Sequence, residues 1–370
     1  MNWQPATPYN DLPDLPPRQQ VETRAVLKAA IEARAALASL DQAARRITNP
    51  TVLINAIPLL EAQASSEIEN IVTTADDLFR FAQDESSASN PATKETLNYR
   101  AALFAGVALI DARPLSSTTA VEVCTIIQGR EMDVRSLSGT YIGNPATRAA
   151  IYTPPVGEQL IRDKLSNWQE FVHGSRGLDP LVTMAIAHYQ FEAIHPFEDG
   201  NGRTGRIMNI LMLISAGLIT QPILYLSRYI IEKKDEYYRL LLEVTRDSHW
   251  EEWILFILQG VRTTALSTVS KIDHIQTLQD ETLVTIRATT SAANADLLAV
   301  LFEQPYCRIA NVKERCGVSR PTATNWLNAL VQAGVLLDVK AGRERLFINT
   351  RFFELLTRPE TAPQAEPTLF

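Results

Sequence analysis

The residues of this chain best suited to chemistry lie between positions 195 and 206, in the run HPFEDGNGRTGR. Gly200 and Gly202 let the backbone curl, so that N–H groups point inward where a new helix begins. A helix N-terminus of this kind favours an anion. Arg203 and Arg206 lie three residues apart on one face of that helix, so both guanidiniums can reach the same anion. The run therefore predicts a phosphate site.

Three more side chains of the run would complete a site for phosphoryl chemistry. Asp199 offers the hard oxygen ligand that Mg²⁺ takes, and Asn201 can donate to a phosphate oxygen. His195 ends the preceding helix and is a candidate general base. Together these are the parts of a triphosphate site. The letters from Gly200 onward also match GxGxxG, but a helix precedes them rather than a strand, so we reject a dinucleotide-binding fold.

The run resembles the signature HxFx[D/E]GNGRxxR of the Fic family (filamentation induced by cyclic AMP), and every specified position matches. The resemblance covers residues 20–265 or so. It implies a protein adenylyltransferase, which moves AMP from ATP to a Ser, Thr or Tyr hydroxyl of a target protein or of itself and releases pyrophosphate. It implies His195 as the base and Asp199 as the ligand of Mg²⁺, with Mn²⁺ as the alternative ion. The implied ATP and phosphate contacts are Gly200, Asn201, Gly202, Arg203, Thr204, Gly205 and, on the γ-phosphate, Arg206.

Two further sites follow from this resemblance. Short β-prone pieces at 139–142 and 149–153, separated by a turn-rich stretch, predict a hairpin. The hairpin resembles the family's flap, which docks the target as an extended strand. The flap residues that would meet the target are Tyr141, Ile142, Ile151 and Tyr152. Tyr238 stands where the family lines its adenine pocket.

A built-in brake is the third implied site. The run SSEIEN at 65–70 resembles the family's inhibitory motif [S/T]xxxE[G/N]. The resemblance implies that Glu69, one helical turn after Ser65, pairs with Arg206 and withholds it from the γ-phosphate, because a carboxylate and a phosphate compete for one guanidinium. We expect a short helix here, from Ser65 or Ser66 to about Thr74. A capping box of Ser66 and Glu69 is the plainer interpretation of the same letters.

The elements that must position these sites are mainly helices. We expect a proline-rich extended arm over residues 1–17, and an apolar helix that Asp179 caps and Pro180 begins. The predicted fold class is mainly α: a Fic-type helical core with a small β-hairpin flap, and a C-terminal winged helix-turn-helix domain. The predicted parts are an N-terminal helical domain with the inhibitory helix (1–95), the catalytic core (96–265), a helical connector (266–290), the winged helix-turn-helix (291–358) and a tail (359–370).

The C-terminal part resembles a helix-turn-helix, with Gly317 in the turn and Ser319 capping the recognition helix. Residues 301–357 hold eight Lys and Arg against five Asp and Glu, although the whole chain has a net charge of −7. Side chains of the types that contact bases and phosphates suggest DNA as a partner: Arg320, Thr322, Thr324, Asn325 and, in the basic wing tip, Arg343. A winged helix used only for protein contacts or dimerisation fits equally well.

Composition bounds the other classes of protein. The chain has 370 residues, 46% of them hydrophobic, which suits two or three globular domains. The longest apolar run, Ile210 to Ile219, is half of the roughly 20 residues that a bilayer span needs. With no signal-like start, we expect a cytoplasmic protein without membrane contact. Three cysteines without CxxC spacing argue against a disulfide framework or a zinc site. The family resemblance implies a homodimer.

Three activities fit these observations. The leading one is a self-inhibited adenylyltransferase. In the second, Glu69 activates water and the enzyme removes AMP from a modified protein. The third is a DNA-binding regulator that senses ATP without turnover, but His195 argues against it because sensing needs no base. A different donor such as UTP stays open, since the signature contacts phosphates rather than the base.

Overall fold

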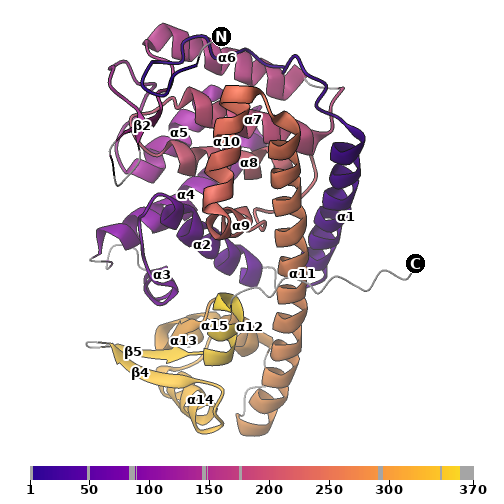
Figure 1. Ribbon diagram of the computed structural model, residues 1–370. Coiled ribbons are helices and arrows are strands. Elements are labelled where there is room, and N and C mark those ends of the chain that lie inside the picture. The colour runs from indigo at the N-terminus through magenta and orange to yellow at the C-terminus, as the bar shows by residue number, and fades with distance from the viewer. Residues whose placement is uncertain are drawn as a thin grey trace.

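The computed structural model describes residues 3–47, 51–82, 88, 90–143, 147, 149–174, 177–290, 295–341 and 344–358. This part of the chain is built mainly from helices, with two small antiparallel sheets (Figure 1). The mainly α fold class is confirmed. No helix in the described ranges is long and apolar enough to cross a membrane.

The elements before the C-terminal region are α1 (Arg24–Arg46), α2 (Thr51–Ile68), α3 (Ala75–Phe81), α4 (Pro91–Ala112), α5 (Ser117–Gln128), β1 (Ile142–Gly143), β2 (Ala150–Tyr152), α6 (Glu158–Gly174), α7 (Pro180–Ile194), α8 (Asn201–Ser215), α9 (Leu226–Glu232), α10 (Lys234–Asp247) and α11 (Trp250–Thr289).

Helices α7 and α8 form the centre of the larger body and are joined by the loop that carries His195 (Figure 1). The side chain of Asp179 caps α7 by accepting from Leu181 N–H at 2.8 Å, and Pro180 is its first residue, as predicted. Every residue of α8 from Asn201 to Leu213 is buried. A helix that is buried on every face must have neighbours on all sides, and the polar side chains in its first half must find partners there. The loop is therefore held between two rigid buried supports.

The secondary structure of residues 65–70, the segment predicted to act as a brake, differs from the prediction. Helix α2 runs without a break through Pro58 to Ile68, so the expected separate helix beginning at Ser65 or Ser66 is wrong, and so is the capping-box interpretation. Packing explains this, because α2 is buried along most of its length and burial outweighs the one backbone hydrogen bond that Pro58 removes. Glu69 therefore lies just beyond the C-terminal end of a long helix.

The turn after α2 explains the Asn of the motif. Asn70 has a φ of 63°, in the left-handed region. Its N–H donates to the carbonyl of Glu67 at 2.9 Å, and the N–H of Ile71 donates to the carbonyl of Ser66 at 3.0 Å. These two bonds make a Schellman turn, whose left-handed position favours Gly or Asn. The turn directs the chain away from α2 at Glu69.

The predicted hairpin is present but shorter than expected, with Ile142 opposite Tyr152 and Gly143 opposite Ala150. The N-terminal arm crosses its base, where the N–H of Tyr9 donates to the carbonyl of Thr153 at 3.0 Å. Further along the arm, Leu15 exchanges two hydrogen bonds with the side chain of Asn167 in α6. The arm is therefore an extended segment bound to the core, as its prolines suggested.

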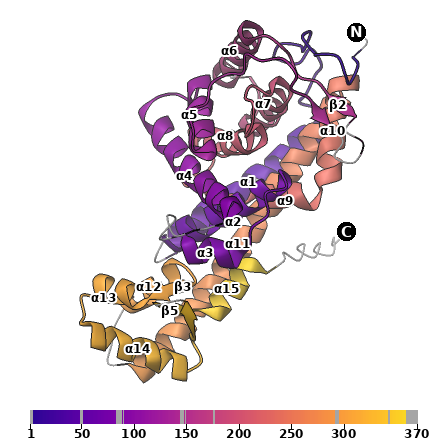
Figure 2. The ribbon, with the colours of Figure 1, turned by 90° about the vertical axis from the view of Figure 1, so that its left-hand side faces the viewer.

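Helix α11 has 40 residues and runs from the core into the C-terminal region (Figures 1 and 2). The predicted boundary between core and connector at 265–266 falls inside it, with Ala265 and Thr268 buried on either side. The second half of α11 occupies the predicted connector. A continuous helix at this point is a stiff link rather than a flexible one.

The C-terminal elements follow in the predicted order of helices and a small hairpin: α12 (Ala295–Glu303), β3 (Tyr306–Arg308), α13 (Ile309–Arg315), α14 (Arg320–Gln332), β4 (Leu337–Ala341), β5 (Glu344–Ile348) and α15 (Thr350–Thr357). The strand order is β3-β5-β4, Gly317 has a φ of 63° in the turn, and Ser319 caps α14. This region packs on α3, where Tyr306 bonds Asp76 and the rings of Phe79 and Phe353 lie 6.0 Å apart. The winged helix-turn-helix interpretation and the predicted domain boundaries stay predictions, and the predicted tail, 359–370, lies outside the described residues.

Candidate active site

The loop between α7 and α8 has a tightly held backbone. His195 ends α7 with a φ of 49°, and its N–H donates to the carbonyl of Phe191 at 3.0 Å. Gly200, with a φ of 81°, begins the turn into α8. The buried amide of Asn201 accepts from the N–H of Phe197 at 2.8 Å and donates to its carbonyl at 2.9 Å. The Asn201 side chain therefore fastens the loop, and this differs from the phosphate contact we predicted for it.

A buried arginine that the sequence did not indicate supports the same loop. Arg135 Nε donates to the carbonyl of His195 at 2.8 Å, and Nη2 donates to the carbonyl of Ile194 at 3.3 Å. Its backbone N–H donates to the carbonyl of Pro196 at 2.9 Å. Three consecutive carbonyls are thus held by one residue from an irregular segment, which is why no sequence pattern marked it.

His195 is set up as a proton acceptor. Burial of its imidazole and the neighbouring Arg135 charge lower its pKa to about 4, although the carboxylates of Glu69 and Asp199 act in the opposite direction. The ring is therefore neutral near pH 7. A neutral imidazole is the form that can take a proton from a hydroxyl.

The start of α8 has the properties of an anion site. Arg203 is buried, with an ion pair of 2.6 Å to Glu95 from α4 and a longer approach of 3.9 Å to Asp199. Glu95 is a second residue that the sequence did not indicate, since α4 carries no motif. The backbone N–H groups of the first turn of α8 add the partial positive charge of the helix terminus. Two arginines and a helix N-terminus thus converge within one turn.

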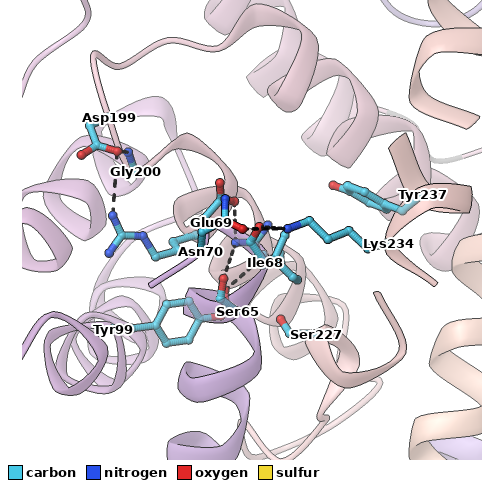
Figure 3. Close-up of polar contacts among 12 residues, drawn as sticks. Ser65, Ile68, Glu69, Asn70, Tyr99, Asp199, Gly200, Ser227, Lys234 and Tyr237 are labelled. Carbon is cyan, nitrogen blue, oxygen red and sulfur yellow. Dashed lines mark hydrogen bonds and ion pairs between the residues drawn. The ribbon is translucent and has the colours of Figure 1, made fainter. Parts of the chain in front are cut away.

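Arg206 is held by the segment that we predicted as a brake, in which Figure 3 labels Ser65, Glu69 and Asn70. Its Nε donates to Ser65 Oγ at 2.8 Å, and Nη2 donates to the Ser65 carbonyl at 2.8 Å and to Glu69 Oε1 at 2.9 Å. Burial opposes ionisation of Glu69, but the Arg206 charge and hydrogen bond keep its pKa below the usual value. Glu69 is therefore a carboxylate, and the predicted pairing of Glu69 with Arg206 is present in the structure.

The Glu69 carboxylate also lies over the N-terminus of α8. A Cβ atom on Gly202 would collide with Glu69 Oε1 and lie 2.9 Å from Arg206 Nη1. Gly202 is the second residue of α8, so the space it leaves open is the place where an anion meets the helix end. A protein carboxylate now fills that space.

Two more groups surround the pair. Glu192 of α7 faces Gly205, and its Oε1 is buried without a hydrogen-bond partner among the described residues. Burial and the nearby Glu69 charge raise the pKa of Glu192 to about 7, against the opposing effect of Arg206. Tyr238 of α10 is 39% exposed, and burial of its hydroxyl and the Glu69 charge raise its pKa. Its neighbour Tyr237 is fully buried and bonds His188 at 2.9 Å.

Asp199 fits the predicted metal ion in part. Its carboxylate is exposed, and Oδ1 accepts from the N–H of Gly200 at 2.6 Å. Over the described ranges, no group of three His, Cys, Asp or Glu residues could hold a metal by itself. One exposed carboxylate beside an anion site suits Mg²⁺, which keeps several waters and is commonly bound by one or two carboxylates together with substrate phosphates.

The flap residues divide into two groups. Tyr141 and Ile151 are exposed, and Ile142 is half-buried. Tyr152 is buried, and its hydroxyl donates to the carbonyl of Ala193 at 2.8 Å. The Tyr152 side chain therefore anchors the flap to α7 two residues before His195, and docking of the target on the flap stays a prediction.

The residues considered for DNA binding are spread over the start of α14. Arg320 and Asn325 are exposed, whereas Thr322 bonds Ser319 and Thr324 bonds the carbonyl of Arg320, both at 2.8 Å. Arg343 lies outside the described residues. The nearby Arg345 is paired with Asp338, which reduces the positive charge of this hairpin. DNA binding and the homodimer stay predictions.

The helical fold and a histidine beside an anion cradle define a Fic-type protein, and comparison with known proteins agrees. Family models match residues 27–108 (Fic/DOC family N-terminal), residues 119–213 (Fic/DOC family) and residues 278–352 (Protein adenylyltransferase SoFic-like, C-terminal domain). The chain belongs to the Fic/DOC family. The last match covers the end of α11, the elements from α12 to β5 and the start of α15, so the C-terminal region is also of a known type.

Curated relatives match over short segments. Protein adenylyltransferase fic-1 of Caenorhabditis elegans is 34% identical over 89 residues, which are 24% of this chain and 16% of that protein. Protein adenylyltransferase Fic of Drosophila melanogaster is 41% identical over 58 residues, which are 16% of this chain and 12% of that protein. The matches thus span less than a fifth of these relatives.

Solved structures share the fold. A Fic family protein from Desulfovibrio desulfuricans G20 aligns with a TM-score of 0.54 and 19% identity, over 90% of this chain and 98% of that one. A Fic-1 structure from C. elegans aligns with a TM-score of 0.50 and 19% identity, over 66% of this chain and 73% of that one. At these identities the likeness concerns the fold alone.

Proposed function

We propose that this chain is a protein adenylyltransferase that moves AMP from ATP to a Ser, Thr or Tyr hydroxyl on a target protein or on itself. The observation that carries the proposal is the neutral His195 beside an anion site made by the start of α8, Arg203 and Arg206. A base and a phosphate cradle joined by one short loop are the minimum that nucleotidyl transfer needs.

The chain's own residues have separable roles in this reaction. His195 takes the proton of the target hydroxyl while the hydroxyl oxygen forms a bond to the α-phosphorus of ATP. The bond from that phosphorus to the bridging oxygen breaks, and pyrophosphate leaves with its electron pair. The N–H groups of the first turn of α8 hold the phosphates, with Arg203 and Arg206 beside them. Asp199 would hold Mg²⁺, which neutralises phosphate charge when bound.

We further propose that Glu69 keeps the enzyme inhibited. Its carboxylate occupies the open space over Gly202 and bonds the guanidinium that the γ-phosphate needs. ATP can bind productively only after Glu69 has moved, so the pairing lowers the apparent affinity for ATP. Asn201 contributes to the phosphate site through its backbone N–H, since its side chain fastens the loop.

The target would dock on the flap. Tyr141 and Ile151 are the exposed flap residues, and Ile142 is partly accessible. Pairing of a target segment with the backbone of the hairpin would place its hydroxyl near His195 by main-chain hydrogen bonds rather than by a specific side chain. Tyr238 borders the same site and is our candidate for stacking on the adenine.

Incubation with Mg²⁺ and α-³²P-ATP tests the proposal. We expect strong protein labelling by Glu69→Gly, weak labelling by wild type and none by Glu69→Gly with His195→Ala. Labelling of the double variant at the level of Glu69→Gly would refute the role of His195. Equal labelling of wild type and Glu69→Gly would refute the brake and leave the transferase in place.

Removal of AMP from a modified protein is a second candidate, favoured by one observation. Glu69 and His195 lie close enough for each charge to affect the other's pKa. Glu69 could therefore orient a water that attacks the phosphorus of an AMP–protein ester and releases AMP and the free hydroxyl. Loss of label from pre-modified protein, with Mg²⁺ and without ATP, should then require Glu69. Unchanged removal by Glu69→Gly would exclude this role.

A further inference from the structure

The C-terminal end of α2, which Glu69 follows directly, is bound by a lysine from another part of the chain. Lys234, the first residue of α10, donates from Nζ to the carbonyl of Ile68 at 2.6 Å and approaches Asn70 Oδ1 at 3.5 Å (Figure 3). The last carbonyls of a helix have no partner within it, and a cation there is favourable. Lys234 therefore satisfies a free carbonyl at the negative end of α2.

The two contacts of Lys234 lie on either side of Glu69. Ile68 is the last residue of α2, and Asn70 holds the left-handed position of the turn that follows. A group that binds both residues restrains the peptide between them. The side chain of Glu69 projects from that peptide onto Arg206 and over Gly202. The position of the carboxylate is thus coupled to the ammonium of Lys234.

Helix α10 also presents Tyr238 to this turn. Lys234 and Tyr238 are four residues apart, on one face of α10. The Tyr238 hydroxyl is close enough to Glu69 for the carboxylate to affect its ionisation. The turn therefore lies between α8, which binds the Glu69 side chain, and α10, whose Lys234 binds the Ile68 carbonyl before Glu69 and approaches the Asn70 side chain after it.

We propose that Lys234 is a latch for the brake, and that its grip on Ile68 and Asn70 keeps the Glu69 carboxylate in the phosphate space. The inference rests on the proposed function, because it assumes that Glu69 competes with ATP. Lys234 is a positioning residue: it acts through Glu69. Losing it should free the turn, populate the open state and tighten ATP binding without a change in the chemical step.

Binding of a fluorescent ATP analogue with Mg²⁺ to the full chain tests the latch. The variants are Lys234→Met, Lys234→Arg and, as a matched control one residue earlier, Lys233→Met, whose side chain is exposed and pairs with Glu236. We expect Lys234→Met to bind the analogue roughly three- to tenfold more tightly than wild type, because the hydrogen bond that is lost is partly exposed to solvent and therefore weaker than a buried charge-assisted one. Lys234→Arg should restore most of the wild-type affinity, and Lys233→Met should not change it.

The same substitution in a Glu69→Gly background separates the latch from direct contact with the nucleotide. The carboxylate that Lys234 positions is absent from that background, so Lys234→Met should not change the affinity for the analogue any further. A further gain or a loss in that background would show that Lys234 acts on the nucleotide itself, and would overturn the latch. If Glu69→Gly tightens binding but Lys234→Met matches Lys233→Met, the latch is wrong and the brake stands. If Glu69→Gly has no effect, the brake has failed and the latch with it.

Discussion

Replacing Glu69 in two steps would measure the strength of the brake. In the structure, Glu69 Oε1 lies 2.9 Å from Arg206 Nη2, and 34% of the Glu69 side chain is exposed against 2% of the Arg206 side chain. A hydrogen bond that involves a charged group contributes about 1.5–3 kcal/mol, and a neutral one about 0.5–1.5 kcal/mol. Because solvent reaches a third of Glu69, we take a value near the lower end, about 2 kcal/mol.

This energy sets the expected gain in ATP affinity. Glu69→Gly removes the whole contact, so the binding-competent state should become roughly 30-fold more populated, as about 2 kcal/mol implies. Glu69→Gln keeps a neutral acceptor and still fills the space over Gly202. Its gain should therefore be smaller, roughly three- to tenfold. We expect ATP affinity to be highest for Glu69→Gly, lower for Glu69→Gln and lowest for the wild type.

Isothermal titration with ATP and Mg²⁺ would measure this order, with His195→Ala in every variant so that no turnover occurs. Thermal melting gives an independent check. Without ATP, Glu69→Gly should melt at a lower temperature than its parent, because the buried Arg206 loses a counter-ion. With ATP the difference should shrink or reverse, since the γ-phosphate replaces the carboxylate. Equal ATP affinity in all three proteins, or a larger gain for Gln than for Gly, would refute the competition between Glu69 and phosphate.

Three further predictions follow from the same geometry. Since the pKa of His195 is about 4, the rate of labelling by Glu69→Gly should change little between pH 5.5 and 8. If the rate instead fell with decreasing pH around a midpoint near 6.5, His195 would have the pKa of an ordinary histidine. The pKa of Glu192 is raised to about 7, so the folded state binds this proton more tightly than the unfolded state does. The free energy of unfolding should therefore fall by up to about 3 kcal/mol as the pH rises from about 4.5 to 7. Urea unfolding would measure this pH dependence, which should disappear in Glu192→Gln. At a φ of 63° alanine lacks the local side-chain hydrogen bonding that makes the left-handed region accessible to asparagine, so Asn70→Ala should cost about 1 kcal/mol and tighten ATP binding several-fold in the titration above. Asn70→Gly keeps the turn and should tighten ATP binding less.

The active-site loop could be predicted because its chemistry is local. His195, Asp199 and Arg206 lie within twelve consecutive residues, and the two glycines and the helix start dictate how they are presented. The pairing of Glu69 with Arg206 was available only through the family resemblance, since the two residues are 137 positions apart. No local rule relates residues at that separation. The mainly helical fold was predictable for the same local reason, because apolar residues recur at the helical period along most of the chain.

The support of the site could not be predicted. Arg135, Glu95 and Glu192 carry no motif, and each matters through a neighbour from another element: the His195 carbonyl, Arg203 and Gly205. Two side chains of the predicted sites have partners within the folded chain that the sequence did not indicate. The Asn201 amide bonds the Phe197 backbone, and the Tyr152 hydroxyl bonds the Ala193 carbonyl.

The sequence by itself determined which groups can do the chemistry, that is, a base, a carboxylate, two guanidiniums and a flexible glycine backbone, because side-chain chemistry and helix termini are properties of a few adjacent residues. Tertiary structure alone decided their state. Burial makes His195 neutral, and packing continues α2 past Ser65, so that Glu69 projects from the end of a helix onto Arg206. Protonation and competition for a partner depend on desolvation and on charges brought together from distant positions, and these exist only after the chain has folded.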